Sequence, residues 1–177
     1  MTSEQETEST AGKPEGGEFA LQDILLRLGQ LNYSWTNTES LLIHLIAGLA
    51  PVNMQVATVI FLTLNTTRAR LDLVERLAKL GATPKPVASE ILSITRELSK
   101  YSALRNRYNH CIYSFDKDGT SISSIQMRIS DRKEDIRFGR SQLMNAQELF
   151  MIDTSISEIQ NLNRQIWALI TKHHFPG

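Results

Sequence analysis

One long, largely apolar repeat with regular spacing constrains the fold of this chain more than any other feature of its sequence. Between residues 84 and 112, side chains of mostly apolar character recur at alternating steps of four and three, the spacing of one face of a long helix. The members of this repeat are Val87, Ile91, Ile94, Leu98, Tyr101, Arg105, Tyr108 and Ile112. A helix from about Pro84 to His110 with one apolar face needs other helices to cover it, so the repeat predicts a helical bundle.

Four further segments carry helical spacing of apolar residues. Two of them have capping signals at their start: Asn37 or Thr38 before the second, and Asn145 with Glu148 three residues later before the last. Gly81 is expected to end the third as its C-cap. The predicted helices are Phe19–Leu31, a segment from about Thr38 to Leu49, a long one from about Val52 to Leu80, and Ala146 to His173.

The period changes between the fourth and fifth of these helices. Two short runs of strand character, residues 112–115 and about 121–129, flank an Asp-Gly turn signal at Asp118-Gly119. The alternation of Ile125, Met127 and Ile129 with polar residues predicts that these three face the core. Residues 130–139 are expected to form an irregular loop or a short third strand. The fold class is therefore mainly α: a bundle of about five helices, with a small β-hairpin insertion and basic loop over about 112–140 before the last helix.

The charge of the chain is unevenly distributed. It has 177 residues, 19 of them Lys or Arg and 19 Asp or Glu, and 41% are hydrophobic, which is enough for one packed domain. Residues 1–19 hold five glutamates against Lys13 alone. We predict a disordered acidic tail over 1–17 and a single domain over 18–177. The tail is either a solubilising leader or a mimic of nucleic acid that covers a basic surface.

The sequence favours a cytoplasmic protein. Its N-terminus has neither a basic start nor an apolar stretch of the signal-peptide type. Cys111 is the single cysteine, so no internal disulfide can form. Residues 41–62 are long enough to span a membrane, but they include His44, Pro51 and Asn53. Two buried helices broken near Pro51 are expected instead, and no membrane partner.

Arg105 occupies a position of the helical repeat that calls for an apolar side chain, and Asn106 and His110 lie close to it. On a helix, Arg105 and His110 are about 140° apart around the axis, and the three cover one broad side. A half-buried guanidinium needs a carboxylate or a phosphate as partner. A histidine can transfer protons near neutral pH. These groups are sufficient for RNA cleavage without metal, through attack of the ribose 2′-hydroxyl on the adjacent phosphate.

The Arg-Asn-x3-His motif at residues 105–110, near the end of a long bundle helix, resembles the HEPN superfamily. The resemblance implies a metal-independent endoribonuclease that leaves a cyclic phosphate, in many cases a toxin or defence protein. It implies a homodimer in which two motif copies meet, and it allows an antitoxin or regulatory protein as partner. By this resemblance Arg105 and His110 are catalytic, and Asn106 orients them. No cofactor and no metal are expected.

A basic surface near the motif is the second candidate feature. Between residues 128 and 140 five basic side chains outnumber three acidic ones, which gives a charge of +2. These residues could follow an RNA backbone, or they could form a solvated loop with local ion pairs. The predicted RNA-binding residues are Arg107, Asn109, Arg128, Arg132, Lys133 and Arg137.

Two alternatives remain open at this stage. The chain could be a non-catalytic HEPN-like module that binds a nucleotide, RNA or a protein. It could also be a structural helical dimer, in which Arg105 pairs with a core carboxylate such as Asp72, Glu75 or Glu158 and His110 caps its helix. The sequence contains no Gly-rich phosphate loop and no zinc or dinucleotide fingerprint.

Overall fold

The computed structural model describes residues 21–117, 121–132 and 135–176, and the predicted acidic tail over 1–17 lies outside them. The described chain is mainly helical, as predicted, with small antiparallel sheets before the last helix. The helices are α1 (Leu21–Glu39), α2 (Leu42–Leu49), α3 (Met54–Thr63), α4 (Thr67–Ala78), α5 (Lys85–Asn109) and α6 (Ala146–Lys172). The strands are β1 (Cys111–Phe115), β2 (Ile122–Gln126), β3 (Ile129–Arg132), β4 (Asp135–Phe138) and β5 (Ser141–Leu143).

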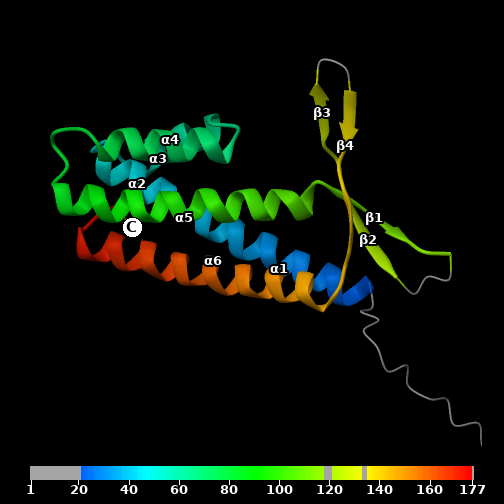
Figure 1. Ribbon diagram of the computed structural model, residues 1–177. Coiled ribbons are helices and arrows are strands. Elements are labelled where there is room, and N and C mark those ends of the chain that lie inside the picture. The colour runs from blue at the N-terminus through cyan, green and yellow to red at the C-terminus, as the bar shows by residue number, and fades with distance from the viewer. Residues whose placement is uncertain (1–20, 118–120, 133–134, 177) are drawn as a thin grey trace, which may run out of the picture.

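Helices α1, α5 and α6 lie side by side along the length of the molecule (Figure 1). Helix α4 packs against α5, α2 packs against α4, and α3 packs against α2. The predicted repeat supplies the α5 side of the core. Its members from Val87 to Tyr108 are buried, except for Arg105. The predicted stripe of α6 (Ile152, Ile156, Ile159, Ile166 and Ile170) is buried as well. Because each of α1, α5 and α6 contacts the other two, their apolar faces form one continuous core.

The predicted helix over 52–80 is wrong in one respect, because it is two helices. The chain leaves helical geometry at Leu64, and Thr66 then caps α4 by accepting a hydrogen bond from the Ala69 N–H at 3.1 Å. Asn53 caps α3 in the same way, through the Val56 N–H at 2.9 Å. Side-chain caps satisfy backbone N–H groups that a continuous helix would have paired, so the break costs little. Helix α4 ends at Ala78, with Lys79 rather than Gly81 as its C-cap.

The expected cap at Asn37 or Thr38 is also wrong, because α1 continues through both residues to Glu39. The Thr38 hydroxyl donates to the Ser34 carbonyl one turn back at 2.7 Å, instead of capping a new helix. Thr38 and Trp35 are buried, so packing holds this polar stretch in the helix. Helix α2 follows after Leu41 without a side-chain cap.

The predicted hairpin is formed by β1 and β2, which pair antiparallel, and β5 adds to the other edge of β2. The basic loop predicted after it contains a second hairpin, β3–β4, which projects from the bundle beyond the end of α5 (Figure 1). The predicted burial of Met127 and Ile129 is wrong: they are 67% and 65% exposed. Strand β2 ends at Gln126, and the chain turns out of the sheet at Met127, so Ile122 and Ser124 are the buried residues of β2.

Helix α6 begins as the sequence predicted, with Asn145 accepting a hydrogen bond from the Glu148 N–H at 3.0 Å. The predicted break near Pro51 separates α2 from α3. Within the described ranges, no helix is both long and apolar enough to cross a membrane.

Candidate functional site

The C-terminal end of α5 is held where the bundle meets the β-strands. His110 is the C-cap of α5, and its N–H donates to the Asn106 carbonyl at 3.1 Å. The carbonyl of His110 accepts a hydrogen bond from the Met127 N–H at 2.9 Å. The end of the motif helix is thus tied to the point where the chain leaves β2 for the projecting hairpin.

A cleft of about 460 Å³ opens at this junction. The exposed side chains of Asn106, His110 and Arg128 face it from α5 and from the β2–β3 connection. No described side chain forms a hydrogen bond with the His110 ring, so both of its nitrogens are available to a ligand. The lining residues are Ala103, Asn106, Arg107, His110, Gln126, Met127 and Arg128.

Arg105 does not line this cleft itself but reaches it through Asn106. One guanidinium nitrogen, Nη1, donates to the Asn106 Oδ1 atom at 2.9 Å. The guanidinium carbon lies 5.3 Å from the centre of the Trp35 ring, a cation–π contact. The Nε atom is buried and has no hydrogen-bond partner among the described residues. Desolvation lowers the pKa of Arg105, and the nearby negative charge of Glu39 opposes this effect.

None of the carboxylates considered as partners of Arg105 in a purely structural role is bound to it. Asp72 pairs with Arg68 at 2.9 Å within α4, and Glu75 of α4 pairs with Lys79, its C-cap residue, at 3.8 Å. Glu158 is exposed on α6. Guanidinium N–H groups that a core carboxylate would have bound are therefore free.

Glu39 is the carboxylate whose negative charge acts on Arg105, but its oxygen atoms already bind donors of other residues. Its Oε1 atom accepts from the Thr67 hydroxyl at 2.6 Å and lies 3.2 Å from an Arg70 guanidinium nitrogen. Its Oε2 atom accepts from the Trp35 indole N–H at 3.1 Å. Arg70 is thus the ion-pair partner of this buried carboxylate. Arg105 lies near the pair but takes no part in it.

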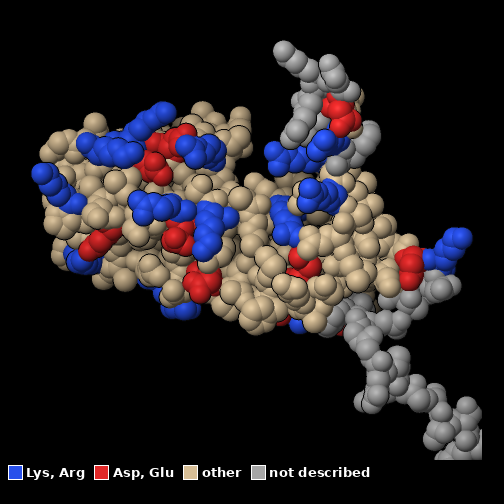
Figure 2. Space-filling view, viewed as in Figure 1, with Lys and Arg blue, Asp and Glu red and all other residues tan. Residues whose placement is uncertain are grey.

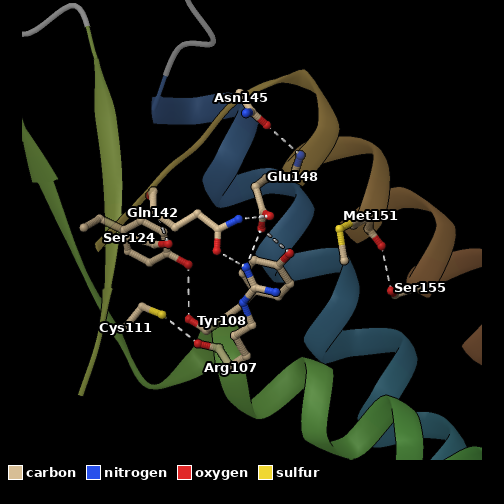
Figure 3. A network of polar contacts seen from close by, with 10 residues as sticks. Arg107, Tyr108, Cys111, Ser124, Gln142, Asn145, Glu148, Met151 and Ser155 are labelled. Atoms are coloured by element: carbon tan, nitrogen blue, oxygen red, sulfur yellow. Dashed lines mark hydrogen bonds and ion pairs between the residues drawn. The ribbon is translucent and has the colours of Figure 1, made fainter. Parts of the chain in front are cut away.

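A second buried carboxylate, Glu148 of α6, organises the other side of the motif (Figure 3). It accepts hydrogen bonds from the Tyr108 hydroxyl at 2.8 Å and from Arg107 Nη2 at 3.0 Å. The Gln142 amide of β5 also donates to Glu148, and its oxygen accepts from Arg107. Burial, followed by the hydrogen bond to Glu148, raises the pKa of Tyr108. This network fixes the last turn of α5 against α6 and β5, and it holds Arg107 at the edge of the cleft.

The remaining predicted RNA-binding residues are dispersed. Asn109 lies away from the cleft, where its amide and that of Asn32 in α1 bond to each other at 2.6 and 2.9 Å. Arg137 on β4 pairs with Asp135 at 3.0 Å. The backbone of Arg132 belongs to β3 but its side chain is not described, and Lys133 lies outside the described residues. Of the predicted set, Arg107 and Arg128 therefore line the cleft.

Figure 2 shows how charge is arranged around this junction. Basic side chains gather where the β3–β4 hairpin leaves the bundle, whereas basic and acidic side chains alternate over the helical body in the same view. Arg128 and Arg140 are exposed and form no ion pair within the described residues. These two unpaired cations thus flank the β3–β4 hairpin at its base, and Arg128 also lines the cleft.

Sequence reasoning missed two parts of the site. Gln126 and Met127 line the cleft because β2 ends there, and the period-two pattern gave no sign of that end. Glu148 was interpreted as a capping residue, and its backbone N–H is indeed capped by Asn145. Its carboxylate belongs to the α5 network instead, a tertiary contact that spacing along one helix cannot reveal.

Comparison of the chain with models of protein families, with curated proteins and with solved structures finds no significant match. The described residues also contain no cluster of three or more His, Cys, Asp or Glu suited to a metal ion. The resemblance to the HEPN superfamily therefore rests on the motif at 105–110 and its place in a helical bundle.

Proposed function

We propose that this chain is a metal-independent endoribonuclease of HEPN type. The observation that carries the proposal is the cleft at the end of α5, in which the unpaired ring of His110 and the amide of Asn106 face Arg128, with Arg105 bonded to Asn106 behind them. The cleft thus offers a proton-transfer group and cations at one opening, which cleavage of a phosphodiester requires.

The proposed reaction divides between these groups as follows. A histidine removes the proton of the ribose 2′-hydroxyl, whose oxygen attacks the adjacent phosphorus. The bond to the 5′-oxygen breaks, and a second histidine returns a proton to that leaving oxygen. The products are a 2′,3′-cyclic phosphate and a free 5′-hydroxyl. Arg105 stabilises the negative charge that develops on the phosphate, and Asn106 holds the guanidinium toward the cleft.

The reaction needs two proton-transfer groups, and among the described residues that line the cleft of one chain His110 is the single histidine. A homodimer in which two α5 ends meet supplies both, with His110 of each protomer taking one role. The open, solvent-facing position of His110 supports such an arrangement, because a second copy can approach it. A role as a toxin or defence protein, with a regulatory partner, is part of the same proposal.

The test compares wild-type protein with His110→Ala on several structured and single-stranded RNAs in the presence of EDTA. His174→Ala is the matched control, because His174 is exposed at the far end of α6 and lies outside the cleft. Wild type and control should cleave equally and leave cyclic phosphate ends, whereas His110→Ala should lose at least about a hundredfold in rate.

Equal cleavage by wild type and His110→Ala would contradict the proposal, because a contaminating nuclease would explain it. The same holds if a dimeric wild type cleaves none of the RNAs. RNA binding that Arg105→Ala weakens, without any turnover by wild type, would favour the non-catalytic binding module instead.

A further inference from the structure

Another cavity in the described part of the chain lies away from the motif. It is a groove of about 550 Å³ between the second half of α1, the start of α2 and the second half of α6. The lining residues on which the argument rests are Tyr33, Asn37, Gln160, Asn163, Arg164 and Trp167. Trp35 and Glu39 of α1 face Arg105, whereas Tyr33 and Asn37 face the groove, so the two sites lie on opposite sides of α1.

Two large aromatic side chains are exposed in this groove. Tyr33 is 74% exposed and Trp167 is 43% exposed, although most other large apolar residues of α1 and α6 along this stretch are buried. The Trp167 ring lies 5.2 Å from the His44 ring, and its indole N–H has no acceptor among the described residues. Exposed aromatic rings with a free polar edge are typical anchors of binding surfaces.

Amide side chains line both walls between these rings. Asn37 stands on the α1 wall with no hydrogen bond from its side chain to any described residue. On the α6 wall Gln160 forms a hydrogen bond at the long distance of 3.5 Å to Ser34, and Asn163 one at 3.3 Å to Thr38. Each amide therefore retains both a donor and an acceptor, the combination that pairs with the N–H and C=O groups of an extended peptide.

Among the described side chains that line the groove, one is a cation without an ion-pair partner. Arg164 is exposed and has no ion-pair partner in the part of the chain that the structure describes, and none of the lining residues is acidic. One cation is complementary to one acidic side chain or to a carboxylate terminus. A nucleic-acid strand, by contrast, needs a row of cations along its backbone, which this groove lacks.

The spacing of the α6 residues sets the length of the ligand. Gln160, Asn163, Arg164 and Trp167 follow one another over about two turns, or roughly 10 Å along the helix. An extended peptide rises about 3.3 Å per residue, so about three residues fill this length. We propose that the groove binds an extended peptide segment of a partner protein, with an acidic residue on Arg164 and an apolar residue against Trp167.

The experiment selects from a pool of random heptapeptides displayed on phage, with the full-length protein as bait. Three surface variants are selected in parallel: Trp167→Ala, Arg164→Glu and, as matched control, Arg96→Glu. Arg96 is an exposed arginine of α5 outside the groove, so its reversal changes net charge equally. Thermal unfolding of each variant checks that it is folded.

Wild type and Arg96→Glu should enrich the same peptides, with Asp or Glu next to an apolar residue. The best peptide should bind Trp167→Ala at least about tenfold more weakly, and Arg164→Glu should lose the acidic preference. The peptide should also shift the indole N–H resonance of Trp167. No enrichment on wild type, equal binding to Trp167→Ala, or displacement of the peptide by a dT12 oligonucleotide would overturn the proposal. His110→Ala protein should bind the peptide as wild type does, so failure of the ribonuclease proposal leaves this one standing.

Discussion

The Nη2 atom of Arg107 lies 3.0 Å from Oε2 of Glu148, and this ion pair joins the motif end of α5 to the first turn of α6. The side chain of Glu148 is 4% exposed and that of Arg107 27%, so the carboxylate depends on protein donors rather than on water. The Tyr108 hydroxyl and the Gln142 amide complete its hydrogen bonds (Figure 3). The position of the cleft thus depends on one buried charge.

Glu148→Gln should therefore lower the free energy of unfolding by about 2–4 kcal/mol, because it leaves Arg107 without its counter-charge and turns an acceptor into a donor. Urea denaturation measures the loss. Glu158→Gln is the matched control, since Glu158 is exposed on the same helix, and its effect should stay within about 0.5 kcal/mol. Equal stability of the two variants would show that the network contributes nothing.

Replacement of Arg70 by alanine should destabilise the protein far more than replacement of Arg105. Arg70 neutralises buried Glu39 and donates to the Phe61 and Leu64 carbonyls, so Arg70→Ala should cost about 3 kcal/mol or more in unfolding free energy. Arg105→Ala removes a guanidinium with a buried, unpaired Nε, so it should cost less than about 1 kcal/mol.

The same pair of variants separates function from structure. Arg105→Ala should retain its thermal stability and lose RNA binding or cleavage. A loss of stability as large as that of Arg70→Ala would instead assign Arg105 to the structural role in which no ligand is involved.

The parts of the fold that the sequence predicted are those fixed by local pattern. The repeat of α5, the stripe of α6 and the Asn145 cap each depend on residues within one helix, and all three are present. The split between α3 and α4 was missed because apolar spacing continues through Leu64, and nothing in the sequence distinguishes Thr66, which caps the start of α4, from other threonines.

The candidate site, like the fold, was predictable only where local sequence pattern determines it. Asn106 and His110 were identified from spacing, and the cleft contains both. The environment of Arg105 was not predictable, because it depends on Arg70 having already taken Glu39, a contact between α1 and α4. The pairing of Arg107 with Glu148 depends likewise on α5 and α6 meeting at one end of the bundle.

Alkaline pH should destabilise the protein through groups beside the site whose pKa is raised, among them the half-buried Tyr113 and Cys111. Burial raises the pKa of Tyr113 to about 12 and also raises the pKa of Cys111. Each group prefers its neutral form in the folded state, so its contribution to stability is complete below its unfolded pKa and is lost as pH rises toward its folded pKa. The free energy of unfolding should fall above about pH 9, where thiols begin to ionise in the unfolded chain.

Urea denaturation at pH values from 7 to 11 measures this dependence. Tyr113→Phe should show a shallower decline above about pH 10, because the unfolded chain then loses one ionising phenol. An identical pH profile for wild type and Tyr113→Phe would contradict the assignment.

Gly139 and Gly29 should give opposite results when replaced by alanine. A Cβ atom at Gly139 would collide with the backbone carbonyl of Gln126, which lines the cleft, so Gly139→Ala must displace the chain between β4 and β5. A Cβ atom at Gly29, in the middle of α1, meets nothing within 4 Å. Gly29→Ala should therefore stabilise the protein by about 0.5–1 kcal/mol through its higher helix propensity.

Hydrogen exchange locates the effect of each change. In Gly139→Ala, the Met127 N–H, which bonds to the His110 carbonyl, should exchange faster, because the neighbouring Gln126 backbone must move. Its protection in Gly29→Ala should be unchanged or greater. Gly139→Ala could instead leave the Met127 N–H fully protected while RNA cleavage is lost. Gly139 would then affect the reaction without disturbing the hydrogen bond that ties His110 to the cleft wall.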